Sequence, residues 1–135
     1  MDLGIEGETA LVQASTRGIG YGCAEALVEA GARVVINGLD EDRGQAAAAR
    51  LGGGTRFLAA DVAEPDERAR LHDAALAHLG HISILVTNVG QGEYGKLPEF
   101  AADRWHGAFE NTMLSALDLV APCLPAMTAP GFGRV

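Results

Sequence analysis

Apolar positions along the chain follow two periods in turn, and the change between them predicts strands followed by helices. Short apolar or β-branched runs are typical of buried strands; they begin at Thr9 and cover 33–37, 56–60 and 82–86. Apolar residues three and four apart indicate helices, over about 18–30, 41–51, 65–80 and 102–127. Pro122 and Pro125 predict a bend or early fraying in the last helix.

This order of elements predicts the fold class. Strands that alternate with helices are joined by right-handed crossovers, which make the strands parallel and place helices on both faces of the sheet. We therefore expect an α/β fold with a doubly wound, Rossmann-like parallel sheet. Residues 131–135 resemble a turn that enters a fifth strand, so the sheet is expected to be cut short before that strand. No linker or repeat interrupts the chain, which predicts a single domain over 1–135.

Composition narrows the classes of partner. The chain has 135 residues, 48% of them hydrophobic, and a formal net charge of −8. Nucleic acid is not an expected partner, because phosphate backbones need clustered Lys and Arg.

No apolar run approaches the roughly 18 residues of a membrane span. The N-terminus lacks the pattern of a signal peptide, and Cys23 and Cys123 lie far apart in predicted helices. These features favour reduced thiols and a cytoplasmic location.

The stretch from Thr9 to Gly20 carries the first functional signal. An apolar run gives way to small residues, and Gly18-Ile19-Gly20 then opens a helical pattern. A tight turn from strand to helix points backbone N–H groups and the positive end of the helix at one spot, which suits a phosphate. The alternative interpretation of Gly18 and Gly20 is a turn with close helix packing and no ligand.

Four segments in order extend this signal. They are Ala14 to Gly20, Asp61-Val62 after the third strand, Leu85-Val86-Thr87-Asn88-Val89-Gly90, and 105–127 ending Leu124-Pro125-Ala126-Met127. The first resembles the Gly-xxx-Gly-x-Gly motif of the short-chain dehydrogenase/reductase family. The others resemble that family's adenine-contacting Asp, its Asn-Asn-Ala-Gly loop and its long helix before the fifth strand.

The resemblance implies a dinucleotide-binding domain that holds NADP or NAD across the carboxyl ends of the strands. The residues that it implies for cofactor binding are Ala14, Thr16, Arg17, Gly18, Ile19, Gly20, Leu39, Asp61, Val62, Asn88, Val89 and Gly90. For Asp61 the alternative is a helix or turn cap. For Asn88 it is a polar tie between adjacent strands, which can coexist with cofactor binding.

The choice between the two cofactors depends on the end of the second strand. NAD enzymes of the family tend to place an acid there for the ribose 2′-OH, and NADP enzymes place an Arg nearby. Here the positions are Gly38 and Leu39, and Asp40 follows as a possible ribose acid or as the start of a helix. Arg17 could pair with a 2′-phosphate, so we favour NADP, with NAD as the alternative.

Several positions depart from the family pattern. Ala14 stands at the first motif glycine, where a methyl is expected to be tolerated only at negative φ and with space beside the cofactor. Thr87 and Val89 replace Asn and Ala of the loop. The family's catalytic helix Asn falls on Thr112, with Asn111 one position early. Since a helix turns about 100° per residue, Asn111 is expected to point away from the site; the alternative is that both are ordinary helix residues.

The family's catalytic Tyr-xxx-Lys pair is absent from this stretch. Tyr21 and Tyr94 lack a Lys four residues later, so the Ser, Tyr and Lys are expected beyond Val135, in the remainder of a longer fold. The resemblance implies an oxidoreductase that moves hydride between nicotinamide and a small carbonyl or alcohol. It also implies a homodimer or homotetramer through the long helix. The alternatives are a non-catalytic nucleotide-binding or interaction module and a decayed fragment.

Overall fold

A four-stranded parallel sheet forms the centre of the computed structural model, which describes residues 3–88, 95–99 and 101–135. The strand order is β3-β2-β1-β4. The strands are β1 (Thr9–Val12), β2 (Arg33–Gly38), β3 (Arg56–Ala59) and β4 (Ile84–Val86). All three strand pairs are parallel. The predicted Rossmann-like class is therefore confirmed, with each strand within two residues of its expected bounds.

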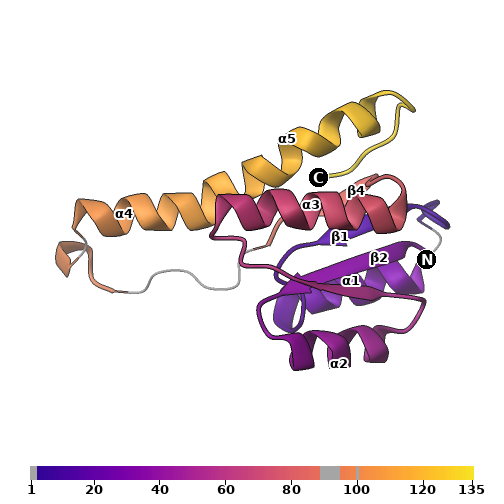
Figure 1. Cartoon of the computed structure of the whole chain (residues 1–135), viewed down its shortest axis with the longest axis horizontal. Helices are drawn as coiled ribbons and strands as arrows, with labels where there is room; N and C mark the ends of the chain where they lie inside the picture. Colours follow the sequence, from indigo (N-terminus) through magenta and orange to yellow (C-terminus); the bar gives the residue numbers. More distant parts are fainter. Residues whose placement is uncertain (1–2, 89–94, 100) are drawn as a thin grey trace.

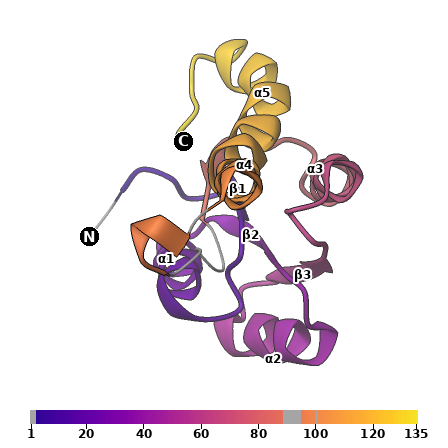
Figure 2. The same ribbon diagram turned by 90° about the vertical axis from the view of Figure 1, so that its left-hand side faces the viewer.

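Helices cover both faces of this sheet (Figures 1 and 2). The helical segments are α1 (Gly18–Glu29), α2 (Glu41–Leu51), α3 (Pro65–Leu79), η1 (Leu97–Glu99), α4 (Ala102–Phe109), the π-helical turn η2 (Glu110–Leu114) and α5 (Ser115–Thr128). Figure 2 shows α1 and α2 on one side of the strands, and α3 and α5 on the other. Among the described residues, no helix is both long enough and apolar enough to cross a membrane.

Successive residues of the central strands pack into two separate cores. Ala10, Val12 and Ile36 belong to the core on the α1 and α2 face. Leu11 and Val35 belong to the core beneath α3 and α5. This is the period-two alternation of a sheet that is covered on both faces, which explains why the strands are apolar throughout.

Both cysteines are free thiols. Cys123 is buried in the second core, and its burial raises the pKa of the thiol.

The long helix is interrupted upstream of its prolines. α5 runs from Ser115 to Thr128 through Pro122 and Pro125, and the irregular segment is η2. In Figure 1, α5 rises away from the direction of α4. The hydroxyl of Thr112 donates to Ala108 O (2.6 Å) and that of Ser115 donates to Asn111 O (2.6 Å). Such bonds compete with the backbone ladder and often bend helices, and these two fall at the irregular segment rather than at the prolines.

The last described residues pair with the outer edge of β4. Arg134 N donates to Ser83 O (3.0 Å), and Leu85 N donates to Arg134 O (2.9 Å). A parallel bridge joins Ile84 and Arg134. The turn predicted over 131–135 therefore leads the chain alongside β4, at the position of a fifth strand.

Candidate functional site

A cavity of about 580 Å³ opens beyond the carboxyl ends of β1, β2 and β3. Ligand sites of open α/β sheets lie at this edge, and the volume is within the usual range of such sites. The sequence-predicted residues that line the cavity are Ala14, Thr16, Arg17, Gly18, Ile19, Leu39, Asp61, Val62, Asn88 and Asn111. Gly20 and Thr112 are not in the lining. Val89 and Gly90 lie outside the described residues.

The turn after β1 contains a strained alanine. Ala14 has φ +47°, and it is the only non-glycine residue with positive φ in the described part of the chain. The negative φ that was set as a condition for tolerating a methyl at this position is therefore not met. Ala14 instead adopts the left-handed conformation that favours glycine, and its Cβ makes this conformation sterically unfavourable. In this conformation Asn37 Oδ1 accepts from Ala14 N and Asn88 Nδ2 donates to Ala14 O, so two side chains hold the backbone of the turn.

Replacing Ala14 with glycine is expected to raise the free energy of unfolding by about 0.5–1 kcal/mol. The left-handed conformation costs an L-residue roughly 1–2 kcal/mol, and the greater freedom of glycine in the unfolded chain offsets about half of that gain. Urea unfolding followed by circular dichroism measures the change. The matched control is Ala49→Gly on the exposed face of α2, which should lower stability by about 1 kcal/mol. Destabilisation by both substitutions would contradict strain at Ala14.

The start of α1 leaves a suitable place for an anion. Arg17 is the N-terminal cap residue, no side chain caps the helix, and the first turn has no acidic residue. The first N–H groups of a helix have no intrahelical acceptor, and they attract negative charge together with the helix dipole. Gly18 has φ +62°, and a Cβ built on it would meet no atom within 4 Å. The backbone at Gly18 is therefore open on the cavity side.

Gly20 has a different role from Gly18. A Cβ on Gly20 would lie 2.6 Å from Ala14 O and 2.9 Å from Asn88 Nδ2. Gly20 is buried in the first turn of α1, so its missing side chain allows the helix to pack against the turn. Close helix packing was the alternative interpretation of the motif glycines. At Gly20 this packing holds α1 against Ala14 and Asn88, which line the cavity.

Asn37 organises the cavity, and the sequence did not indicate it. Its side chain is 1% exposed. Nδ2 donates to Leu58 O and Ala60 O (both 3.1 Å), and Oδ1 accepts from Ala14 N (3.3 Å). One amide thus fastens the turn after β1 to the segment at the end of β3. The sequence does show a polar residue at the end of a β-branched run. It could not show the hydrogen-bond partners of Asn37, because they lie more than 20 positions away in the chain.

Asn88 and Asp61 both make the structural bonds that were the alternatives to cofactor binding. Asn88 Nδ2 donates to Ala14 O (2.9 Å), which ties the end of β4 to the turn after β1. Asp61 Oδ1 accepts from Ala63 N (2.9 Å) and so closes the turn after β3. Both residues also line the cavity. The two functions are compatible at each position, since the carboxylate and the amide have further polar atoms.

Two arginines border the cavity near the end of β2. Arg17 and Arg43 are in the lining together with Leu39, which is 71% exposed. Asp40 caps α2 by accepting from Arg43 N (2.8 Å), and its other oxygen lies 3.7 Å from Arg43 Nη2. Asp40 is not in the cavity lining, so the structure places it as the helix start. Arg43 was missed because its position at a helix start resembles that of any solvated residue.

The π turn brings Asn111 to the cavity. Asn111 is in the lining, although the sequence favoured an orientation away from the site. A π turn closes by i→i+5 bonds and so holds an extra residue compared with an α turn. The regular step of 100° per residue, from which the orientation of Asn111 was predicted, therefore does not hold within Glu110–Leu114. Thr112 is exposed, and its hydroxyl donates a hydrogen bond to Ala108 O.

The chain matches known proteins over almost its whole length. A family model described as short chain dehydrogenase matches residues 8–135. The D-beta-hydroxybutyrate dehydrogenase of Cupriavidus necator is 34% identical over 134 residues, which cover 97% of this chain and 52% of that protein. Tropinone reductase-like 2 of Erythroxylum coca is 38% identical over 94 residues, which cover 70% of this chain and 34% of that protein.

A solved structure shows the same arrangement. L-sorbose reductase from Gluconobacter frateurii, complexed with NADPH and L-sorbose, superimposes with a TM-score of 0.88 at 33% identity, over 98% of this chain and 52% of that chain. The chain spans about half the length of this protein and of the Cupriavidus dehydrogenase.

Proposed function

The chain belongs to the short chain dehydrogenase family, and from this premise we propose that the protein is an oxidoreductase that transfers hydride between a nicotinamide dinucleotide and a small carbonyl or alcohol substrate. The observation that carries the proposal is the cavity at the carboxyl ends of the strands, with the uncapped start of α1 on its wall. Within residues 1–135 we assign the dinucleotide-binding part of the fold. The family's Ser, Tyr and Lys are assigned to sequence beyond Val135.

The residues present fit a dinucleotide. The first turn of α1, with Gly18 and Ile19, would hold the pyrophosphate through backbone N–H groups. Asp61 and Val62 would contact the adenine side, and Asn88 would border the nicotinamide side. When bound, the cofactor supplies or accepts the hydride. The work of this chain is to bind and orient it, and to exclude water with apolar groups such as Ile19 and Leu39 at the rim.

Asn111 is the polar residue that we assign to the substrate end of the site, in preference to Thr112. Asn111 lines the cavity, and the π turn that carries it is a form of helix found frequently at functional sites. In this family the helix Asn, whose place in the sequence falls on Thr112, holds a water of the proton relay, and we assign that role to the neighbouring Asn111. Thr112 would require both a different rotamer and the loss of its bond to Ala108 O.

We favour NADP as the cofactor, with NAD as the alternative, because Arg17 and Arg43 border one side of the cavity and Asp40 is occupied as a helix cap. A guanidinium can pair with a 2′-phosphate through two N–H groups. The NADPH complex of the sorbose reductase is consistent with this choice.

Arg17→Ala and Arg43→Ala are each expected to raise the Kd for NADPH by about tenfold or more, since charged hydrogen bonds contribute roughly 1.5–3 kcal/mol. The Kd for NADH should change little, because NADH has no 2′-phosphate. Cofactor fluorescence measures both constants. Arg56→Ala is the control, since Arg56 is exposed at the amino end of β3, away from the cavity. Equal losses for NADPH and NADH would show that neither arginine recognises the phosphate.

The proposed reaction is tested with the protein expressed from its complete reading frame. Titration with NADPH and NADH should give saturable binding, and absorbance of the reduced cofactor should fall with a panel of small ketones and aldehydes. Saturable binding without turnover of any carbonyl or alcohol would favour the non-catalytic module. A folded protein that binds neither cofactor would exclude both interpretations.

An apolar face on the long helix supports assembly of identical subunits. Its residues are each about half exposed and recur mostly at a spacing of four, which places them on one side of α4, η2 and α5: Trp105, Phe109, Met113, Leu117 and Leu124. An exposed apolar face of this kind is typical of a protein interface. We propose that it joins subunits into a homodimer or homotetramer.

A further inference from the structure

Arg68 is the largest fully buried side chain among the described residues, with 1% of the residue exposed. It lies in the first turns of α3, and neither composition nor the family resemblance indicated a role for it. Burying a guanidinium costs several kcal/mol unless its charge and its N–H groups are matched. The contacts of Arg68 therefore indicate what the buried cation does.

On one side, Arg68 holds the loop after β3. Its Nη1 donates to Val62 O (2.8 Å) and to Ala63 O (3.0 Å). Val62 and Ala63 line the cavity next to Asp61. The loop that would contact the adenine side is thus fixed from beneath by two hydrogen bonds to one nitrogen.

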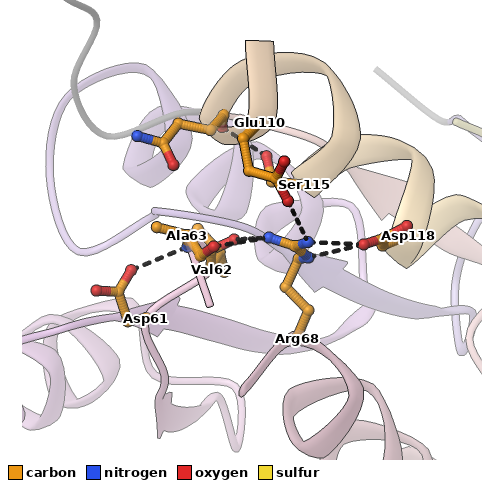
Figure 3. Close-up of polar contacts among 8 residues, drawn as sticks. Asp61, Val62, Ala63, Arg68, Glu110, Ser115 and Asp118 are labelled. Atoms are coloured by element: carbon orange, nitrogen blue, oxygen red, sulfur yellow. Dashed lines mark hydrogen bonds and ion pairs between the residues drawn. The ribbon is translucent and has the colours of Figure 1, made fainter. Parts of the chain in front are cut away.

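On the other side, Arg68 holds the long helix (Figure 3). Its Nε and Nη2 donate to Asp118 Oδ2 of α5 (3.1 and 2.7 Å). Nη2 also lies 3.6 Å from Glu110 Oε1, at the start of η2. Glu110 directly precedes Asn111, the cavity residue of this helix. The five N–H groups of an arginine form a rigid planar fork, and here they face two carbonyls and two carboxylates.

Stability alone does not require this arrangement. Replacement of a buried ion pair by apolar residues of similar volume is often neutral or stabilising. Asp118 and Glu110 are also half exposed, at 50% and 45% of their side chains, which weakens the attraction through solvent. The guanidinium of Arg68 instead fixes the position of the loop after β3 relative to the long helix, and both of these segments border the cavity. Lysine, with its donors on one atom, could not bridge both sides.

We propose that Arg68 is a positioning residue of the cofactor site. It couples the Val62–Ala63 wall to the turn that carries Asn111, so that binding at the adenosine end and placement of Asn111 depend on one guanidinium. The inference rests on the proposed dinucleotide function. Arg68 itself is not in the cavity lining, and it acts through the backbone of Val62 and Ala63 and through Glu110 and Asp118.

The test uses the double variant Arg68→Met with Asp118→Leu in the protein expressed from its complete reading frame. It removes the fork and both charges of the pair while keeping the space filled. We expect only a modest fall in the urea midpoint, because Val62 O and Ala63 O lose a donor but stay partly open to water. The Kd for ADP-ribose should rise about fivefold or more, within the usual range of coupling between sites, and kcat should fall. ADP-ribose contains the adenosine end and lacks nicotinamide, so its Kd reports on the loop.

Asn111→Ala, made in the wild type and in the double variant, separates positioning from packing. If Arg68 places Asn111, removal of the amide should lower kcat in the wild type and have little further effect in the double variant. Arg68→Lys keeps the charge without the fork, and it gives the same comparison if the double variant does not fold.

The outcomes distinguish this inference from the proposed function. A stable double variant with wild-type Kd for ADP-ribose and wild-type kcat would overturn the role of Arg68 and leave the proposed function intact. Fully additive losses from Asn111→Ala would do the same. A wild-type protein that binds no dinucleotide would overturn the proposed function, and the Arg68 inference with it.

Discussion

Replacement of Gly20 by alanine is expected to lower the free energy of unfolding by about 1–3 kcal/mol, the usual cost of overpacking, and to weaken dinucleotide binding strongly. The added Cβ would lie 2.6 Å from Ala14 O and 2.9 Å from Ser15 Cα. Both neighbours are backbone atoms, so they cannot move aside without reshaping the turn. Asn88 Nδ2, at 2.9 Å, would lose its bond to Ala14 O in the same movement.

The matched control for this substitution lies two residues along the same helix. A Cβ on Gly22 would meet no atom within 4 Å, and Gly22 is exposed. Gly22→Ala should therefore stabilise α1 by up to about 1 kcal/mol through helix propensity, and leave cofactor affinity unchanged. Urea unfolding and cofactor titration of both variants give the comparison. Equal behaviour of Gly20→Ala and Gly22→Ala would contradict the close packing of α1 against the turn.

Asn37→Ala is expected to destabilise the protein by about 2–5 kcal/mol. Each buried group left without a partner costs roughly 1–3 kcal/mol, and the substitution removes the partner of Ala14 N, Leu58 O and Ala60 O. The turn after β1 would also lose one of the two side chains that bond to the backbone of Ala14. We therefore expect weaker cofactor binding as well, in any part of the population that stays folded.

Two further variants make the Asn37 prediction specific. Asn37→Asp keeps an acceptor for Ala14 N but directs a carboxylate at Leu58 O and Ala60 O, so it should destabilise at neutral pH despite its similar size. Gln45→Ala removes an exposed amide that donates to Glu41 Oε1 (2.9 Å), and it should change stability by less than about 0.5 kcal/mol. Unfolding of Asn37→Ala and Asn37→Asp at the wild-type urea midpoint would contradict the fastening role of Asn37.

Local patterns predicted the fold because they act over short distances. The β-branched run at 33–37, the acidic start at Asp40 and the proline at Pro65 each specify one element, and β2, α2 and α3 begin where expected. The long helix was less predictable. Its irregular segment contains hydroxyl bonds from Thr112 and Ser115 to the preceding turn. The prolines predicted an irregularity further along, where α5 is continuous.

The site was predictable where the backbone dominates it. Gly18, Ile19 and Asp61 line the cavity as the motif indicated. A methyl at Ala14 needs a negative φ to avoid strain, but the sequence could not show which φ the turn adopts, because the partners Asn37 and Asn88 come from other strands. Arg68 illustrates the same limit, because its partners are carbonyls and carboxylates that only the tertiary fold brings together.

The most direct test of the cofactor site is a crystal structure of the protein, expressed from its complete reading frame, with NADPH or NADH bound. We expect the pyrophosphate against the N–H groups of Gly18 and Ile19, the adenosine beside Asp61 and Val62, and Asn111 facing the nicotinamide end. A cofactor bound outside the cavity between the turn after β1 and the loop after β3 would contradict the assignment. So would a complex in which the first turn of α1 makes no contact with phosphate.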